Sequence, residues 1–284
     1  MQMSAKDRRR CQLSLLATKI ERTALEAVRM DACYKVNVQK TSVINIDDLH
    51  TADAKSGYIS LQNAQSAQCA KVHVWNMDTV LAARKVQKEF NWKPLVLNMA
   101  SAWCPGGGWR KGAEAQEECM FYQTLLCAHL ATVHQGRRVG PYLKASEVVY
   151  SPTVPVLRDG PETDYTPLKS KDRMYIDVLS VPAVRHPALK NGSTVYARES
   201  DHKLMQIKVN AIFEVARKYG YKELILGALG CGAYGNPAPV VLEMFRDALK
   251  VYGQYFTDIV FAVYDKHVDE HSNFTLFSSL TVNN

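Results

Sequence analysis

Hydrophobic residues recur along most of the chain at spacings typical of helices and strands. Apolar positions repeat with a helical period in five segments, which are residues 11–30, 78–90, 116–130, 204–219 and 240–249. Short apolar or alternating runs predict strands at residues 71–76, 95–98, 146–157, 175–181, 223–229 and 258–265. This alternation of strands and helices predicts an α/β sandwich with a parallel or mixed sheet.

Three segments are less regular. Residues 146–157 contain Pro152 and Pro155, which fits an edge strand or an extended segment because proline cannot donate to a sheet ladder. Residues 31–70 are polar and irregular, with short strand candidates at 36–39 and 43–47. A long surface loop is expected over residues 182–203.

Composition narrows the class of protein and the compartment. The chain has 284 residues, of which 47% are hydrophobic and 22% charged, as in an ordinary soluble globular protein. No apolar run approaches the roughly 18–20 residues that span a membrane. The seven cysteines form no CxxC pair, which argues against a disulfide framework and a structural zinc site. We therefore expect an intracellular protein of the cytoplasm or nucleus, and the net charge of +7 suits an anionic ligand.

Two glycine-rich loops follow predicted strands and lead into predicted helices. The first contains Gly106, Gly107 and Gly108, and the second runs through residues 227–237. Glycines let backbone N–H groups approach a ligand, and a helix N-terminus adds partial positive charge, so the pair could cradle a diphosphate. The alternative is that both are only tight turns. Neither loop has the Walker A or GxGxxG pattern, so a nicotinamide oxidoreductase is not favoured.

The second loop carries two side chains of interest. Cys231 is expected to be a small packing residue rather than a nucleophile, because no His/Asp arrangement accompanies it. Tyr234 could stack on a sugar or base, or could serve only as a hydrophobic plug.

Two adjacent acids, Glu117 and Glu118, begin the helix after the first glycine loop. They could simply complement the partial positive charge of a helix start. Helical phase places Glu118 on the face of Tyr122 and Leu126, with Glu117 about 100° round the axis. A carboxylate at the head of an apolar face loses hydration, which raises its pKa and suits a general acid. This reasoning favours Glu118.

Residues 95–118, LVLNMASAWCPGGGWRKGAEAQEE, resemble the signature of the poly(ADP-ribose) glycohydrolases, a GGG, a spacer and QEE. Residues 149–159, 224–237 and 256–265 are similar to later segments of the same family, in the same order. The form resembles the compact, microbial-type branch. That resemblance implies a macrodomain-like three-layer α/β/α sandwich over residues 71–284, with a partly helical extension over residues 1–70 packed on it.

The resemblance also implies roles for individual residues. Glu118 corresponds to the catalytic acid, which protonates the leaving ribose oxygen and then helps to activate water. Glu117 corresponds to its neighbour that positions the ribose, and Asn98 to a contact of the distal ribose. The further substrate-binding residues implied are Gly106, Gly107, Gly108, Gln116, Gly230, Cys231, Gly232, Ala233 and Tyr234. The family more often has phenylalanine at the position of Tyr234, and residues 177–187 match it only loosely.

The leading hypothesis is an exo-acting poly(ADP-ribose) glycohydrolase that releases ADP-ribose and so reverses ADP-ribosylation. Its substrates would be poly(ADP-ribose) or ADP-ribosylated proteins, with no metal or redox cofactor, no membrane and a monomeric state. One alternative is a hydrolase of mono-ADP-ribosyl linkages. Another is a non-catalytic ADP-ribose-binding macrodomain, against which the intact QEE argues.

Overall fold

The computed structural model describes residues 3–49, 69–135, 140–190 and 194–281. Within them a seven-stranded mixed sheet has the order β1-β4-β5-β3-β6-β7-β2. Strands β5, β3, β6, β7 and β2 are parallel, and β4 is antiparallel to both neighbours. The strand bounds are β1 Ser42–Asn45, β2 Lys71–Trp75, β3 Leu95–Ala100, β4 Glu147–Val156, β5 Met174–Pro182, β6 Glu223–Leu226 and β7 Asp258–Ala262.

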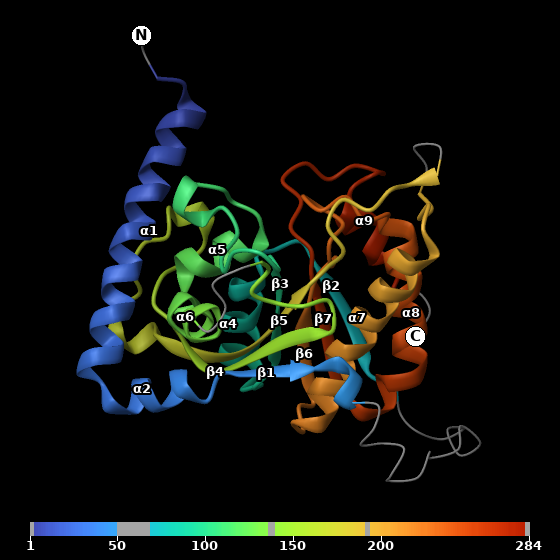
Figure 1. The fold of residues 1–284 in the computed structure, drawn as a ribbon, viewed down its shortest axis with the longest axis horizontal. Coiled ribbons are helices and arrows are strands. Elements are labelled where there is room, and N and C mark those ends of the chain that lie inside the picture. Colours follow the sequence, from blue (N-terminus) through green and yellow to red (C-terminus); the bar gives the residue numbers. More distant parts are fainter. Residues whose placement is uncertain (1–2, 50–68, 136–139, 191–193, 282–284) are drawn as a thin grey trace.

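Helices cover both faces of the sheet, which gives the predicted three layers (Figure 1). One face packs against α1 Ala5–Met30, α2 Ala32–Gln39, α4 Thr79–Phe90, α5 Gln116–Gln123 and α6 Leu126–Gln135. The other packs against α7 Glu199–Lys218, α8 Ala238–Tyr252 and α9 Asn273–Ser278. Each face has its own cluster of buried apolar side chains, because successive strand residues point to opposite sides. None of these helices is long and apolar enough to cross a membrane.

The first helix, α1, is the outermost element of its layer and extends beyond the body of the protein (Figure 1). Its buried residues, Leu13, Ala17, Ile20 and Ala24, share one helical face. That face packs on α5, α6 and the short 3₁₀ helix η2 Trp109–Lys111. The segment before residue 70 also supplies β1, which pairs with β4. The domain boundary at residue 70 stays a prediction, and residues 50–68 of the irregular segment lie outside the described residues.

Two of the expected elements are wrong in the structure. Residues 36–39 belong to α2 rather than to a strand, because Tyr34 and Val38, one helical turn apart, are both buried against the core. The single helix expected over residues 116–130 is two helices that meet at Thr124 and Leu125. There the N–H of Leu125 donates to the carbonyl of Pro155 (3.1 Å) instead of to the preceding helical turn.

Strand β4 lies one position inside the sheet rather than at its edge. Its neighbour β1 pairs only with residues 147–150. Beside the half that contains Pro152 and Pro155, the described residues supply only the isolated bridge of Thr124 to Val156 and the Leu125 hydrogen bond to Pro155. A bulge between Ser151 and Val154 interrupts the pairing with β5 in the same half. The two prolines, which cannot donate to a sheet ladder, are tolerated because this half of β4 lies at a bulge and is not flanked by β1.

Two neighbouring parallel strands, β3 and β6, pair over only two residues and then separate. Leu95 lies opposite Leu224 and Val96 opposite Ile225, after which the ladder ends. The expected strand over residues 223–229 therefore stops at Leu226. The surface loop expected over 182–203 is also shorter, since β5 ends at Pro182 and α7 begins at Glu199; residues 191–193 lie outside the described part. The gap between β3 and β6 opens a crevice at the carboxyl edge of the sheet.

Candidate active site

A cavity of about 390 Å³ lies at this edge, between the two glycine loops. The first glycine loop comprises residues 101–115, after β3, and the second comprises residues 227–237, after β6. Ligands of open α/β sheets bind in such crevices beyond the carboxyl ends of strands. The cavity is lined by Met99, Ala100, Ser101, Trp103, Cys104, Gly107, Gly108, Ala115, Gln116, Glu117, Glu118, Ala183, Arg185, Ala228, Gly230, Gly232, Ala233 and Tyr234.

Gln116 substitutes for the missing strand neighbour of β3. Its side-chain oxygen accepts from the N–H of Met99 (2.9 Å), and its side-chain nitrogen donates to the carbonyl of Leu97 (2.8 Å). The same nitrogen lies 3.2 Å from the hydroxyl oxygen of Thr79 on α4. The carboxamide thus satisfies two backbone groups that β6 leaves unpaired, and it fixes the start of α5 beside the crevice.

Glu117 is held by the first glycine loop. Its carboxylate accepts from the N–H groups of Ser101 (2.8 Å) and Gly106 (3.1 Å) and from the side chain of Asn98 (3.4 Å). Burial raises the pKa of Glu117 to about 8, and the charge of Glu118 adds to the shift. Glu117 therefore retains a proton at neutral pH.

Glu118 is held by both ends of the segment that joins the glycines to α5. One oxygen accepts from the N–H of Gly108 (2.7 Å), and the other from the N–H of Ala115 (3.1 Å). A Cβ atom on Gly107 would lie 2.4 Å from the first oxygen, closer than any real contact. Glycine is required at 107 for this approach and also for its backbone, since φ is +54°.

Helical phase does not separate the two acids as the sequence suggested. Every residue of α5 from Glu117 to Gln123 is buried, so the helix has no solvent-facing side in this stretch. Glu117 is 4% exposed and Glu118 is 8% exposed. A raised pKa is found for Glu117, the acid that helical phase placed off the apolar face. The expectation failed because α5 is covered by α1 and α4 as well as by the sheet.

The second glycine loop is braced by Asn236. Its side-chain nitrogen donates to the carbonyls of Val184 (2.7 Å) and Gly230 (3.2 Å), and its oxygen accepts from the hydroxyl of Tyr196 (2.8 Å). Tyr234 lies at the other end of the loop, with its side chain close to Ser101 of the first loop. Burial raises the pKa of Tyr234, so its hydroxyl keeps its proton at neutral pH.

A second cavity of about 650 Å³ adjoins the first. The two share wall residues from β3, the start of α5 and the second loop, namely Met99, Ala115, Gln116, Ala228 and Gly232. The remaining wall of the second cavity comes from α1, the start of α4, the loop after η2, α5, the loop after β4, the end of β7 and the chain that follows it, and the start of α9. Together the cavities form one cleft along the carboxyl edge of the sheet.

Most of the site residues expected from sequence meet at this cleft, and three do not line it. Gly107, Gly108, Gln116, Glu117, Glu118, Gly230, Gly232, Ala233 and Tyr234 line the first cavity. Asn98 is fully buried, and its side chain donates to the carboxylate of Glu117 and to the hydroxyl of Ser180. Gly106 lies under the loop against Phe121. Burial raises the pKa of the Cys231 thiol to about 12, which suits a packing residue and not a nucleophile.

Sequence reasoning missed three residues that shape the cleft. Ser101 joins Glu117 to the second loop, Asn236 braces that loop, and Arg185 lines the first cavity. Asn236 could have been noticed as a polar residue between a glycine and a proline. Arg185 lies in the segment 177–187 and carried no such signal. Among the described residues, no group of three or more His, Cys, Asp or Glu side chains could hold a metal ion.

Comparison with known proteins gives the family. A family model described as the catalytic domain of microbial-type PARG, poly(ADP-ribose) glycohydrolase, matches residues 18–159, half of the 284-residue chain. The chain belongs to the microbial-type PARG family. As a PARG it is a glycoside hydrolase that acts on poly(ADP-ribose). This confirms the resemblance seen in the sequence. A search of curated protein sequences finds no match.

Solved PARG structures share the fold. A PARG from Thermomonospora curvata is 24% identical over 94% of this chain and 98% of its own, with a TM-score of 0.73. Another structure from that organism, bound to the inhibitor ADP-HPD, has a TM-score of 0.71 at the same identity and coverage. A PARG from Deinococcus radiodurans in complex with ADP-ribose is 24% identical over 86% of this chain and 95% of its own, with a TM-score of 0.65. These similarities establish the macrodomain-like fold.

Proposed function

We propose that this PARG removes ADP-ribose from the ends of poly(ADP-ribose) chains, with Glu118 as general acid and then general base. One observation carries the assignment of the acid. The Glu118 carboxylate lies on the wall of the cavity between the two glycine loops, with each oxygen held by a backbone N–H. Fixed donors of this kind orient a carboxyl group before the substrate arrives.

The proposed reaction breaks the ribose–ribose O-glycosidic bond in two proton transfers. Glu118 donates a proton to the leaving ribose oxygen as the bond to the anomeric carbon breaks. The sugar then resembles an oxocarbenium ion, which the substrate diphosphate helps to stabilise. The Glu118 carboxylate next takes a proton from water, whose oxygen bonds to the anomeric carbon and yields ADP-ribose.

Glu117 is proposed to position the ribose rather than to act as a second catalytic carboxylate. Glycosidases commonly place two carboxyl groups on opposite sides of the scissile bond, at least about 5 Å apart. Here both acids lie around one residue, since a Cβ on Gly107 would be 2.4 Å from an oxygen of Glu118 and 3.4 Å from one of Glu117. Two acids on the same side of the sugar favour a single acid/base.

The cleft suggests where each part of ADP-ribose binds. The distal ribose and diphosphate would lie in the first cavity, along the backbones of Gly107, Gly108 and residues 230–233, with Tyr234 against the ribose. The adenosine half would occupy the second cavity. The two cavities, of about 390 and 650 Å³, are of the size of ordinary ligand sites and give room for one ADP-ribose unit, which supports action at chain ends.

Substitution of the acid tests this proposal. Glu118→Gln should reduce ADP-ribose release from polymer by about 100- to 10,000-fold, as loss of a general acid does, with ADP-ribose binding largely retained by calorimetry. Glu199→Gln, which changes an exposed acid on α7, should behave as wild type. Turnover by Glu118→Gln at more than a few per cent of wild type would refute the role of Glu118.

Product analysis tests the substrate and the mode of attack. Incubation with polymer-modified and singly modified proteins should release ADP-ribose from the polymer alone. Chain-end attack predicts that ADP-ribose is the only small product at early times. Oligomers of two or more units would instead show cleavage within the chain.

We further propose that the protein is a monomer of the cytoplasm or nucleus. The absence of CxxC pairs in its sequence supports a reducing compartment, and the cleft is complete within one chain. Light scattering during size-exclusion chromatography should give the mass of one chain; a dimer mass would exclude the monomeric state.

A further inference from the structure

The spacer between the glycines and the acids, residues 109–115, is held from outside by α1. A Cβ on Gly112 would lie 2.5 Å from the backbone oxygen of Arg10, so the helix backbone rests directly on the spacer. The hydroxyl of Ser14 donates to the carbonyl of Arg110 (2.8 Å), and the Arg110 side chain pairs with Glu21. The N-terminal helix thus contacts the spacer over three of its turns.

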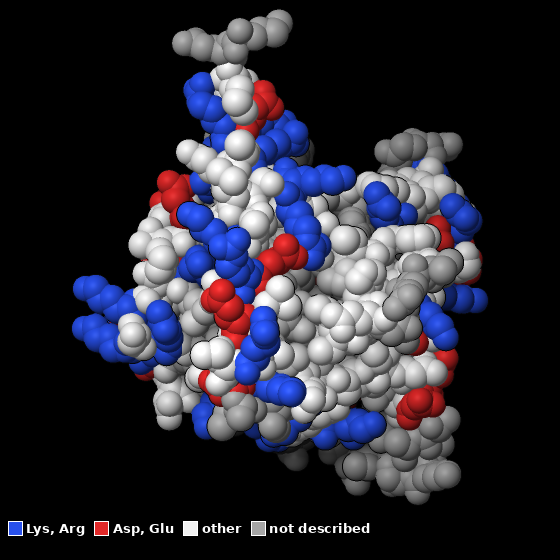
Figure 2. Space-filling view, turned by 60° about the vertical axis from the view of Figure 1, so that its left-hand side comes forward, with Lys and Arg blue, Asp and Glu red and all other residues white. Residues whose placement is uncertain are grey.

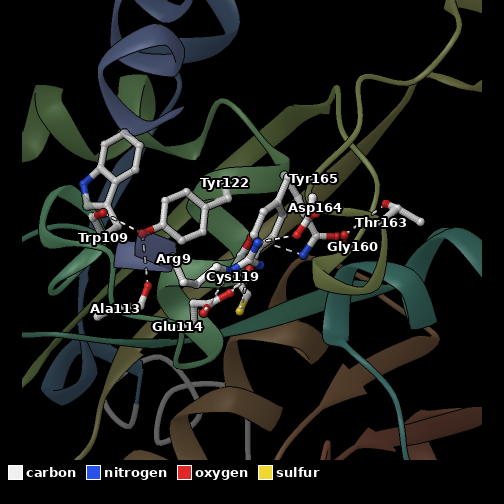
Figure 3. A network of polar contacts seen from close by, with 11 residues as sticks. Arg9, Trp109, Ala113, Glu114, Cys119, Tyr122, Gly160, Thr163, Asp164 and Tyr165 are labelled. Carbon is white, nitrogen blue, oxygen red and sulfur yellow. Dashed lines mark hydrogen bonds and ion pairs between the residues drawn. The ribbon is translucent and has the colours of Figure 1, made fainter. Parts of the chain in front are cut away.

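Arg9 makes the polar connection at the end of this contact (Figure 3). Its guanidinium forms an ion pair with Glu114 of the spacer (2.8 Å) and another with Asp164 of the loop after β4. It also lies 5.8 Å from the centre of the Tyr165 ring, within range of a cation–π contact. One side chain on α1 therefore joins two loops that are both more than 100 residues away from it in sequence.

Two tyrosine hydroxyls contact the spacer on the side that faces the protein core (Figure 3). The hydroxyl of Tyr165 lies 3.4 Å from Glu114 and 3.3 Å from the sulfur of Cys119 on α5. The hydroxyl of Tyr122, also on α5, lies 2.6 Å from the carbonyl oxygen of Trp109 and 3.0 Å from that of Ala113. The spacer is therefore fixed between α1 on one side and α5 on the other.

The two ends of the spacer are the groups that hold Glu118. The N–H of Gly108 precedes the spacer and the N–H of Ala115 ends it, and each binds one oxygen of the Glu118 carboxylate. Glu114, the partner of Arg9, is the residue before Ala115. A shift of Glu114 would move one donor relative to the other and so would turn the carboxylate.

We propose that Arg9 is a positioning residue for catalysis, which acts through Glu114 to keep Glu118 in its productive orientation. This inference rests on the proposed function of Glu118 and gives the N-terminal helix a part in it. Arg9 does not need to touch the reacting atoms. Because arginine presents a planar fork of donors, it can serve Glu114 and Asp164 together, which lysine cannot do as well.

A double-mutant cycle tests this inference. Arg9→Met keeps the length of the side chain and removes its charge, and Glu114→Gln keeps the shape of the partner. Each should lower kcat for ADP-ribose release by about 10- to 100-fold, the size of effect that slight misplacement of a catalytic group produces. The double variant should fall no further than the worse single variant, because both act through one contact.

Control variants separate this role from general effects of charge or stability. Arg22→Met removes an exposed arginine from the same helix and should leave kcat unchanged. Arg9→Lys should recover part of the lost kcat. The ADP-ribose dissociation constant of Arg9→Met should stay within about threefold of wild type, less than the fall in kcat, and its unfolding temperature should stay close to wild type.

Several outcomes would overturn the inference. Arg9 also lines the second cavity, so weaker ADP-ribose binding with unchanged kcat would make it a ligand contact instead. Additive losses in the double variant, or an unchanged kcat in Arg9→Met, would exclude action through Glu114. If Glu118→Gln remained active, the proposed function itself would fail. That failure is seen by comparing Glu118→Gln with the wild type, so it is distinguishable from a failure of the role proposed for Arg9.

Discussion

Glu117 and Glu118 are neighbours in sequence, yet different backbone groups hold their carboxylates. Glu117 binds the N–H groups of Ser101 and Gly106, while Glu118 binds those of Gly108 and Ala115. One glycine loop therefore orients both acids. The sequence predicted an acidic pair at this place, but not this division, because the donors are backbone groups that carry no sequence signature.

The raised pKa of Glu117 predicts a pH dependence of the reaction. Its pKa rises from 4.5 to about 8, so it carries a proton at pH 7 and loses it as the pH rises through 8. Without that proton Glu117 is charged and can no longer donate a hydrogen bond to the ribose that it is proposed to position. We expect kcat of the wild type to fall above about pH 8, by up to tenfold per pH unit.

Glu117→Gln provides the check on this assignment. Its side chain cannot ionise, so the remaining activity should lack the fall in kcat above pH 8, whereas Glu199→Gln should retain it. An unchanged alkaline limb in Glu117→Gln would show that another group causes it.

Gly107 offers a second prediction at the scale of one residue. Gly107→Ala places a methyl group against Glu118 and should lower kcat at least about 100-fold, because the acid must move. Gly220 also has positive φ (+78°), but a Cβ there meets nothing within 4 Å. Gly220→Ala should therefore lose comparable stability, about 1–2 kcal/mol, with no loss of kcat. Equal kcat values for the two variants would contradict the close approach of Glu118 to residue 107.

At the scale of elements, periodicity located the strands and helices but not their ends. Strand β6 ends at Leu226, three residues before the predicted end. The helix over 116–130 breaks at Thr124, because the N–H of Leu125 donates its hydrogen bond to the carbonyl of Pro155 instead of to the preceding helical turn. Both changes depend on a partner distant in sequence, which a local pattern cannot contain. The helix over 36–39 was missed for the same reason, since burial of Tyr34 and Val38 decides it.

The gap between β3 and β6 gives a prediction about stability. Gln116→Leu removes the groups that satisfy the Met99 N–H and the Leu97 carbonyl, and it should cost about 1–3 kcal/mol of unfolding free energy. Gln87 makes one bond at the surface, to the carbonyl of Tyr175, so Gln87→Leu should cost at most a few tenths of a kcal/mol. Urea unfolding measures both; equal losses would mean that Gln116 does not complete the ladder.

At the scale of the molecule, the order of segments along the sequence sufficed to predict an α/β sandwich and the meeting of two glycine loops, while the three-layer form was implied by the family resemblance. It did not reveal that α1 braces the first loop, because the contact is made by backbone at Gly112 and by charged side chains near the surface. Figure 2 shows lysines and arginines along the projecting helix; α1 contains seven of them against three acids. The sequence predicted an extension packed on the main domain, but not which loop it contacts.

Ligand binding should stabilise the whole molecule if the cleft is the ADP-ribose site. At 100 times its dissociation constant, ADP-ribose should add about 2.7 kcal/mol to the unfolding free energy, and so raise the unfolding temperature by roughly 5–10 °C. Glu118→Gln should show a similar rise, and AMP at the same concentration a smaller one. A scan with millimolar ADP-ribose that shows no rise would count against the cleft as its site.

The carboxamide of Gln116 has a consequence for how this site can be observed. Its oxygen is the acceptor of the Met99 amide proton, so the exchange of that single proton with deuterated solvent depends on a side chain rather than on a strand. Protection at Met99 therefore reports whether the start of α5 is in place. The measurement needs neither substrate nor turnover, and it can follow the acid-bearing helix in variants that have lost all activity.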